Sequence, residues 1–277
     1  MRISDVTRQQ AFLTHLFVST CIFIVISYLI VFHWYPEFYF GIDGGIRGIV
    51  TIFFVDVVLG PGLTLLVFNP AKKSLKFDMA IILILQFSAL IWGIKSVYTE
   101  RPATAVFYWG KFSCIAHKDA GEIDLQPIKA GPSGKQRLSI LLRPDTIDER
   151  YSFTKEAFDH QTSEIYYYGS KILPLDKDRV SRLDKYELDL EELRKLEVSD
   201  ADRVETFISS TAISEPYKLI PLACRYGNAI AVYDPRQLRI VDTLNISANI
   251  RAKALDIDTP ANVTVEIKKP EEDTESR

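Results

Sequence analysis

Motifs for catalysis and metal binding are missing from this sequence of 277 residues. Its three cysteines and four histidines form neither a Cys-x-x-Cys pair nor a Cys/His cluster, so we expect no metal site. The chain also lacks an HExxH motif, a glycine-rich phosphate loop and the Gly-x-Ser-x-Gly turn of serine hydrolases. These absences leave no catalytic motif and no cofactor site, and we expect that the protein is not an enzyme.

Charged residues are scarce in one part of the chain. Residues 1–102 hold eight basic and six acidic side chains, whereas residues 103–277 hold 25 and 30. So uneven a distribution indicates two physically different parts that join near residue 100. The acidic excess of the second part argues against a nucleic-acid partner, because such a partner needs a basic surface.

Three long apolar runs lie in the first part. Residues 11–32 carry no formal charge, residues 49–68 carry only Asp56, and residues 79–98 carry only Lys95. A helix needs about 20 apolar residues to cross the hydrocarbon core of a bilayer. The sequence therefore predicts an integral membrane protein in contact with the lipid bilayer. Its transmembrane domain occupies residues 1–102, with spans at about 11–33, 47–68 and 78–98.

Basic residues set the expected orientation of these spans. They lie before the first span and between the second and third, and they are Arg2, Arg8, Lys72, Lys73 and Lys76. The connection between the first two spans carries Glu37 and Asp43, with Arg47 only at its far end. The positive-inside rule then places the N-terminus in the cytoplasm and the second part on the opposite side, which in a bacterium is the periplasm.

Residues 103–257 predict a small α+β domain. We expect one strand over residues 103–118, a second over residues 137–142, and a hairpin around a proline-containing turn at 234–237. A leucine-rich stretch at 188–196 has helical spacing. Residues 258–277 have little apolar content, and we expect them to form a disordered tail.

Two of the three cysteines, Cys114 and Cys224, lie in the predicted α+β domain. A bridge between them would close a long loop, which the chain-entropy estimate values at roughly 4–5 kcal/mol. The alternative is that they are two unrelated buried thiols, since a free cysteine behaves as a small hydrophobic residue. The sequence leaves both possibilities open.

Asp56 is the most informative polar residue of the predicted spans. A carboxylate at the bilayer centre costs about 2.5–3.5 kcal/mol on insertion scales, so it needs a partner or a protein-facing position. Gln86 in the third span and His15 in the first are the candidate partners. A polar tie between helices is favoured over a direct catalytic role.

Glycine and proline follow Asp56 in the motif Gly60-Pro61-Gly62. Proline removes a backbone donor, so we expect a kink in the second span and a free carbonyl beside it. Glu37 and Asp43 could be imagined as a carboxylate pair for acid–base chemistry. With no supporting base or metal ligand nearby in the sequence, we expect them in a solvated loop instead.

These residues belong to a longer pattern. The matching segments are Trp34-Tyr35-Pro36, Asp43-Gly44-Gly45, Val55-Asp56-Val57-Val58-Leu59-Gly60-Pro61, Leu63-Thr64-Leu65, Phe68-Asn69-Pro70, Lys72, Asp78, Gln86 and Tyr98-x-x-Arg101-Pro102-Ala103. The pattern resembles the type IV pilin accessory proteins of the TfpX/TfpZ kind, which are similar to the fimbrial assembly protein FimB. The resemblance is dense over residues 10–105 and thins beyond them, where Leu219-x-Pro221-Leu222-x-x-Arg225 and the hairpin after it look similar.

The resemblance implies a protein of the bacterial inner membrane that influences pilin stability, pilus assembly or pilus dynamics. It implies the major type IV pilin as partner, with other pilus assembly components as further candidates. It carries over no catalytic residue, implies no cofactor and gives no fold for the second domain. We therefore expect a non-enzymatic accessory protein, or chaperone, with a periplasmic domain.

A docking hypothesis follows from the resemblance, because a pilin awaiting assembly is itself a membrane helix. Its helix could dock on Asp56, Gly60, Pro61, Gly62 and Gln86, where small residues allow close approach. Two alternatives remain. One is a membrane enzyme acting on pilin, for which only Glu37, Asp43 and His33 are candidates at the periplasmic rim. The other is a sensor whose outer domain signals inward, although the predicted cytoplasmic segments are too short for an output domain.

Overall fold

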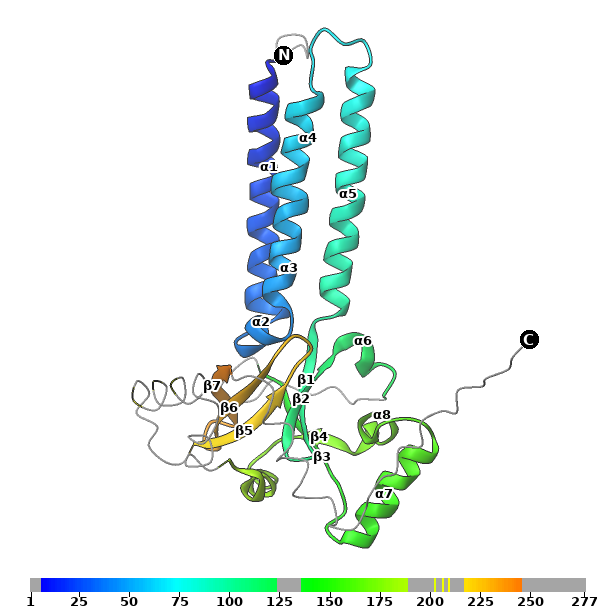
Figure 1. Ribbon diagram of the computed structural model, residues 1–277, viewed down its shortest axis with the longest axis vertical. Helices are drawn as coiled ribbons and strands as arrows, with labels where there is room; N and C mark the ends of the chain where they lie inside the picture. The colour runs from blue at the N-terminus through cyan, green and yellow to red at the C-terminus, as the bar shows by residue number, and fades with distance from the viewer. Residues whose placement is uncertain are drawn as a thin grey trace, which may run out of the picture.

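Three long helices form a stem, and a seven-stranded sheet with short helices forms a head at one end of it (Figure 1). This computed structural model describes residues 6–123, 136–188 and 217–245, together with Asp202, Thr206 and Ser209. The stem comprises residues 8–99, and the head comprises the described residues from Glu100 onward. The prediction of three long apolar helices followed by a mixed α and β domain is confirmed.

The first stem helix is α1 (Arg8–Leu29), which continues as the π-helical segment η2 (Ile30–Trp34). A capping box begins it, because Thr7 and Gln10 each bond the other's backbone N–H. The second helix is continuous through α3 (Gly45–Ile52), the π-helical η3 (Phe53–Leu59) and α4 (Gly60–Val67). The third is α5 (Leu75–Thr99). All three are long and apolar enough to cross a membrane, judged by length and composition.

A π-helical segment stands where the sequence predicted a kink. Pro61 lies in the first turn of α4, directly after η3. Because proline has no N–H, the ordinary i to i−4 bonding cannot continue through this position, and the wider π-helical turn precedes it. Asp56 lies within that segment and is buried.

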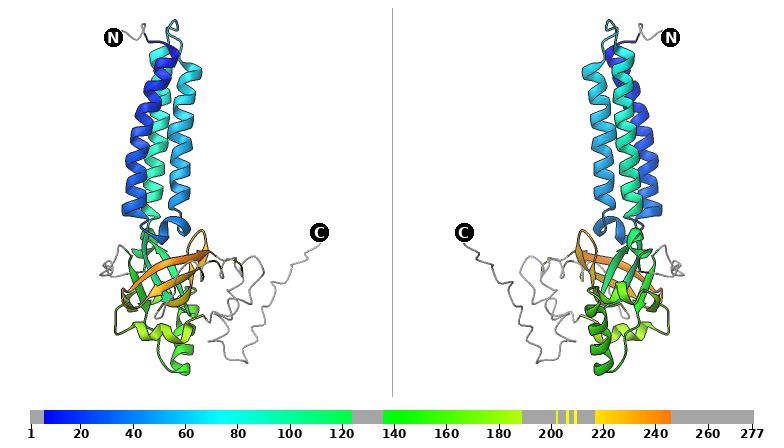
Figure 2. Two further views of the ribbon diagram at one scale, coloured as in Figure 1. Left: turned by 90° about the vertical axis from the view of Figure 1, so that its left-hand side faces the viewer. Right: turned by 90° about the vertical axis from the view of Figure 1, so that its right-hand side faces the viewer.

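The stem passes into the head with almost no linker. Only Glu100 and Arg101 lie between α5 and strand β1 (Pro102–Tyr108), which is an interior strand of the sheet. At the same end of the stem, the short helix α2 (Phe38–Ile42) turns the chain from α1 to α3. The two side views in Figure 2 show the sheet directly beneath the ends of the stem helices.

The sheet has the order β4-β3-β1-β2-β5-β6-β7. Its further strands are β2 (Lys111–Ala116), β3 (Leu138–Leu141), β4 (Ile172–Pro174), β5 (Lys218–Ala223), β6 (Asn228–Asp234) and β7 (Arg239–Asn245). β1 runs parallel to β3, and β2 runs parallel to β5, whereas the other neighbours are antiparallel. The expected strand near 137–142 and the hairpin around the turn at 234–237 are confirmed as β3 and as β6 with β7.

The prediction of one strand over 103–118 is wrong, because the chain reverses at Trp109-Gly110. β1 and β2 pair as an antiparallel hairpin across this turn. Trp109 has φ +49° and Gly110 has φ +71°, the left-handed values that a two-residue hairpin turn requires. Glycine adopts them freely, but a tryptophan rarely does, so the sequence gives little sign of the turn.

Short helices complete the head. They are α6 (His117–Ala120), α7 (Ile147–Asp159), α8 (Glu164–Tyr167), η4 (Gly169–Lys171) and η5 (Val180–Tyr186). Helix α7 was not expected from the sequence. The expected helix at 188–196, apart from Leu188, and the expected disordered tail at 258–277 lie outside the described residues.

Two hydrophobic clusters hold the sheet. One covers the face against α7 and α8, and includes Val106, Phe153 and Ile172. The other joins the head to the stem; its buried residues include Ile30, Tyr35, Tyr39, Phe112, Leu222 and Tyr233. Because stem and head share this second cluster, the apolar core runs unbroken from one into the other.

Candidate functional site

A polar cluster ties the three stem helices together at Asp56. The Gln86 side chain, from α5, donates from Nε2 to Asp56 Oδ1 at 2.6 Å and to Ser19 Oγ of α1 at 3.1 Å. Asp56 is 1% exposed and Ser19 is also buried. Among apolar helices a buried polar group must find its partner inside the protein, so this cluster fixes how the helices pack.

Gly60 makes the room that Gln86 needs. A Cβ atom at position 60 would overlap the Gln86 carboxamide, so no other residue fits there without moving it. Gly62 differs, because nothing lies within 4 Å of the position that its Cβ would take. Pro61, between them, is buried. The structure therefore brings Asp56, Gly60 and Gln86 together and leaves Gly62 facing outward.

His15, the other candidate partner, does not join this cluster. Its Nδ1 lies 2.6 Å from Thr64 Oγ1, and Thr64 in turn donates to the Gly60 carbonyl at 3.2 Å. Asp56 Oδ2 and Gln86 Oε1 have no hydrogen-bond partner among the described residues. The cluster around Asp56 can thus accept further hydrogen bonds.

A second polar cluster lies where the stem meets the head, at a contact that we call the joint. The joint consists of the stem segment 35–44, Glu100 at the end of α5, and the β5–β6 loop at residues 224–227. Asp43 Oδ1 accepts a hydrogen bond from the Arg225 backbone N–H at 3.2 Å, and the Ile42 carbonyl accepts one from the Tyr226 N–H at 3.1 Å. The loop is thus fastened to the stem by two backbone donors.

Charged and aromatic groups reinforce the joint. The Arg225 guanidinium forms an ion pair with Glu100, which also pairs with Lys118 at 2.7 Å. The Arg47 guanidinium lies over the Tyr226 ring, 4.2 Å from its centroid. Gly44 has φ +114°, and a Cβ there would press on the Tyr226 ring at 2.7 Å, so both its backbone conformation and its small size are needed.

Asp43 is 2% exposed, so the expectation that it lies in a solvated loop is wrong. The cause is the β5–β6 loop, which folds over it from a distant part of the chain. Burial raises the pKa of the Asp43 carboxyl to about 6, against the opposing effects of the Arg225 N–H and guanidinium. Asp43 Oδ2 has no hydrogen-bond partner among the described residues.

Glu37 belongs to a different contact, so no carboxylate pair with Asp43 is evident. The Gln136 side chain donates to Glu37, and Arg239 Nη2 lies 3.4 Å from Glu37 Oε2. Gln136 also pairs with both backbone groups of Ile240, at 2.7 and 2.6 Å, as a neighbouring strand would. His33 is exposed, with its ring beside that of Tyr28.

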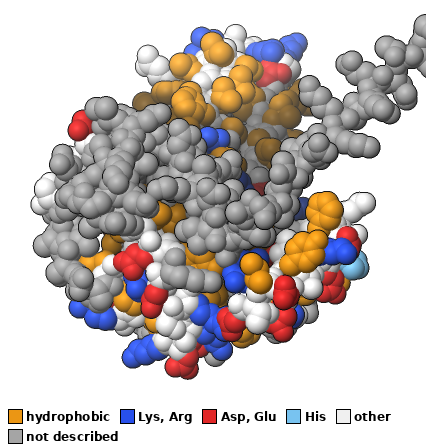
Figure 3. All heavy atoms as spheres, turned by 60° about the horizontal axis from the view of Figure 1, so that its bottom comes forward, with side chains coloured by type: hydrophobic (Ala, Val, Ile, Leu, Met, Phe, Trp, Pro, Cys, Tyr) orange, Lys and Arg blue, Asp and Glu red, His pale blue; other side chains and the backbone are white. Residues whose placement is uncertain are grey.

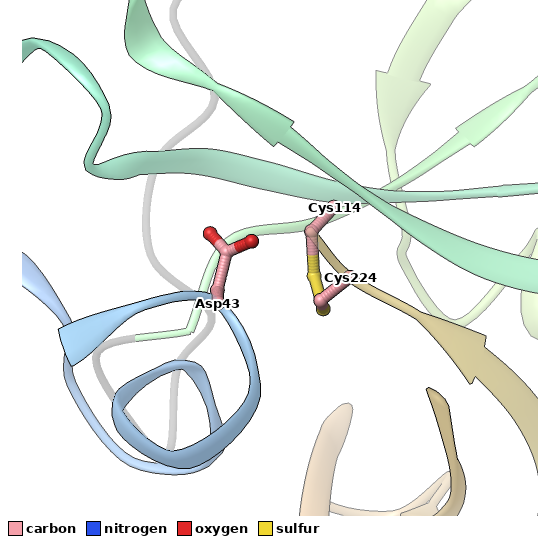
Figure 4. Close-up of side chains that lie close together, drawn as sticks. All are labelled: Asp43, Cys114 and Cys224. Carbon is pink, nitrogen blue, oxygen red and sulfur yellow. A yellow bond between two sulfur atoms is a disulfide. The ribbon is translucent and has the colours of Figure 1, made fainter. Parts of the chain in front are cut away.

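Cys114 and Cys224, the two cysteines that the sequence offered as a possible pair, are joined in a disulfide. The bridge links β2 to the start of the β5–β6 loop, and Figure 4 shows it beside the Asp43 carboxyl. A carboxyl oxygen of Asp43 and the two sulfur atoms all lie within 4.8 Å of one another. Sulfur atoms bonded to each other are not thiolates, so in this form the three residues do not make a metal site.

A cavity of about 350 Å³ lies at the end of the head near the β1–β2 turn, and the sequence gave no sign of it. Trp109 lines it with its left-handed backbone, and the Arg143 guanidinium stacks 4.1 Å from the centre of the indole ring. Arg143 is held in turn by Glu164, at 3.1 Å. Figure 3 shows this end of the molecule, where acidic and basic side chains are mixed over the described part of the surface.

Comparison with known proteins identifies relatives among fimbrial assembly proteins of Dichelobacter nodosus. The chain is 34% identical over 107 residues to the fimbrial assembly protein of serogroup I, which covers 38% of this chain and 42% of that protein. It is 36% identical over 95 residues to the protein of serogroup E1, covering 34% of this chain and 37% of the relative. The same identity and length hold for the protein of serogroups C1 and C2, of which 72% is covered.

No family model and no solved structure matches this chain. The chain spans less than half the length of the serogroup I and E1 proteins. It covers more than two thirds of the serogroup C1 and C2 protein at 36% identity. The resemblance predicted from the sequence motifs is thereby confirmed, and the chain belongs to the fimbrial assembly protein family, which is related to type IV pilus assembly.

Proposed function

We propose that this protein is a non-enzymatic accessory protein of type IV pilus assembly, anchored in the bacterial inner membrane, with the major pilin as its client. Its family membership supports a role in pilus assembly. One observation on the second stem helix carries the client proposal. Gly62 faces outward there, next to the buried polar cluster around Asp56, which has acceptors without a partner among the described residues.

The exposed apolar surface of the stem supports a bilayer position. Each helix exposes large apolar side chains, for example Phe17 at 70%, Leu66 at 74% and Trp92 at 71%. Apolar surface of this extent is unfavourable in water and is covered by lipid tails in a membrane. The basic residues near the N-terminus and in the 69–77 connection favour a cytoplasmic position for that end, and so a periplasmic head.

A client helix would meet the stem at Gly62 and the exposed Leu63 beside it. Small residues let helix backbones approach closely in a bilayer, and Gly62 has open space where a Cβ would stand. Asp56 is buried, so we assign it an indirect role. Together with Gly60, Pro61 and Gln86, it holds the helix in the conformation that presents this surface. Its free Oδ2 is an acceptor for a donor that reaches the cluster.

The enzyme alternative draws no support from the rim of the stem. Glu37 contacts Gln136 and Arg239, and Asp43 accepts from the Arg225 backbone, so the two carboxyls serve separate contacts. The His33 ring lies edge-to-face against the Tyr28 ring. We therefore keep the non-enzymatic proposal.

In-membrane photo-crosslinking tests the client contact. A photoreactive residue would replace Leu63 or Val57 in the full-length protein, and adducts would be detected by immunoblotting for the major pilin. The matched control is the same probe at Ile84, which is exposed on α5 at a similar depth. We expect a pilin adduct from Leu63 or Val57 and none from Ile84. No adduct from normally abundant protein, or equal adducts from all three sites, would refute docking at this surface.

A further inference from the structure

The disulfide between Cys114 and Cys224 has an unusual neighbour in the buried carboxyl of Asp43. Figure 4 shows one carboxyl oxygen turned toward the bridge, and the oxygen and both sulfur atoms lie within 4.8 Å of one another. Both cysteine residues are partly exposed rather than fully buried. The site thus combines a partly exposed disulfide with a group that can exchange a proton.

The hydrogen bonds of the joint do not explain why a carboxyl stands here. Asp43 uses Oδ1 to accept from the Arg225 N–H, and an amide oxygen would serve equally well. Its Oδ2 is buried without a partner among the described residues. An unsatisfied buried polar atom costs about 1–3 kcal/mol, and a structural disulfide needs no acid beside it. Arg225 attracts the charged form of this carboxyl, and the unpartnered oxygen leaves the group free to act at the neighbouring sulfur atoms.

We propose that Cys114–Cys224 is a redox-active disulfide that accepts two electrons from a dithiol, with Asp43 as the group that gives a proton to the departing sulfur. In thiol–disulfide exchange the leaving sulfur departs as a thiolate, and the reaction is faster when that charge is stabilised. At a separation of up to 4.8 Å, a carboxylic acid gives its proton to the sulfur directly or through one water and so neutralises the charge as it forms, which is general acid catalysis.

The exchange proceeds in two balanced steps. A thiolate of the dithiol attacks one cysteine sulfur; the Cys114–Cys224 bond breaks, a mixed disulfide forms, and the departing sulfur takes its electron pair and the Asp43 proton. The second thiol of the reagent, after losing its proton to water, attacks the mixed disulfide. The other cysteine leaves with its electron pair and takes a proton from water. The reagent ends as a cyclic disulfide, both cysteines end as thiols, and Asp43 regains its proton from solvent.

The charged and titratable groups around Asp43 set the pH range of this assistance. Arg225 favours the carboxylate and Glu100 opposes it, while burial raises the pKa of the carboxyl to about 6. Tyr35 and Tyr39, which face Asp43 from the stem, have pKa values raised by burial and stay protonated. Asp43 therefore holds a proton to give below about pH 6 and loses it as the pH rises further.

Reduction would also act on the joint. The bridge fixes the start of the β5–β6 loop to β2, and the same loop supplies the Arg225 and Tyr226 N–H groups that hold the stem. Opening the bridge removes this covalent link, and the loop is then held by the pairing of β5 with β2 and by its hydrogen bonds to the stem. The redox state of the cysteines thereby affects how strongly the stem and the head are joined.

The test uses the full-length protein in detergent micelles, with dithiothreitol as the dithiol. Cys21 is a free exposed cysteine, so it is first changed to serine in all samples. The rate at which Cys114 and Cys224 become reactive toward a maleimide is measured from pH 5 to pH 8 and divided by the thiolate concentration of the reagent. For the protein with Asp43 in place, we expect this normalised rate to fall about tenfold or more as the pH rises from 5 to 8.

Two variants separate proton transfer from a looser joint. Asp43→Asn keeps the acceptor for Arg225 but has no proton to give, so its normalised rate should be about tenfold lower at pH 5 and should not change with pH. Glu100→Gln loosens the same joint and should keep the falling profile. If Asp43→Asn does not fold, the pH profile of the reduction rate in the protein with Asp43 in place still tests the proposal. A flat profile there, or a bridge that resists reduction until the protein unfolds, overturns the proposal.

Discussion

Two buried aspartates, Asp56 in the stem and Asp43 in the joint, show how surroundings decide what one residue type does. Asp56 meets a side-chain amide among apolar helices, and its contact joins three elements that are otherwise held by packing. Asp43 meets a backbone N–H beside a disulfide, where polar groups and ion pairs already hold the parts together. Each leaves its Oδ2 without a partner among the described residues, but only Asp43 has a disulfide beside it. The first is therefore best explained as a tie, and the second by chemistry at the sulfur atoms.

Gly60→Val should give the largest effect, and it tests whether Asp56 ties the stem helices together. Its side chain would push the Gln86 carboxamide away from Asp56, so an overpacking cost of about 1–3 kcal/mol adds to the loss of that hydrogen bond. Protein abundance in the membrane and unfolding in mixed detergent would measure it. Gly62→Ala is the matched control and should stay within about 1 kcal/mol of the unaltered protein. Equal losses from both changes would contradict the assigned contact.

The pH dependence of the joint should be the next largest effect. The pKa of folded Asp43 is raised to about 6, above the value near 3.8 of an unperturbed aspartate. The folded protein therefore binds the proton more tightly, and stability should fall by about 2–3 kcal/mol as the pH rises from about 4 to about 6. Denaturant unfolding of the unaltered protein and of Asp43→Asn across this range would measure the difference. A difference that does not change with pH would argue that Asp43 titrates normally.

Gln86→Leu should have a smaller effect, which sharpens the assignment of Asp56 as a tie. It leaves Asp56 Oδ1 without its donor, and interhelical hydrogen bonds of this kind contribute about 1–2 kcal/mol. Unfolding in mixed detergent would measure it, alone and combined with Asp56→Leu. The double change should cost less than the sum of the two single changes, since both remove the same bond. Additive losses would show that the two residues act independently.

The stem could be predicted closely from the sequence because its signal is local. Runs of about 20 apolar residues and the rarity of charge among them specify membrane-length helices without knowledge of tertiary contacts. The sequence also narrowed the partner of Asp56 to Gln86 or His15, since a polar residue in such a helix has few possible partners, and the structure pairs it with Gln86. The β6–β7 hairpin was equally local, marked by Pro235 between two β-rich runs.

The joint could not be predicted, because it depends on contacts between distant segments. Asp43 is buried by a loop 182 positions away, and nothing in its own neighbourhood signals that cover. The β1–β2 turn was missed because it places Trp109 in a conformation that favours glycine or asparagine. Helix α7 was missed because few of its residues are buried, Phe153 and Ala157 among them, so its apolar periodicity is weak.

The direct passage from α5 into β1 makes the head a lever. With only Glu100 and Arg101 between helix and strand, a tilt of α5 must carry β1, an interior strand of the sheet, with it. A partner helix that leans on the stem would then swing the far end of the head, where the cavity beside Trp109 lies, through an arc larger than the movement that caused it. A chain with a flexible linker at this point would not transmit the tilt of α5 to the head.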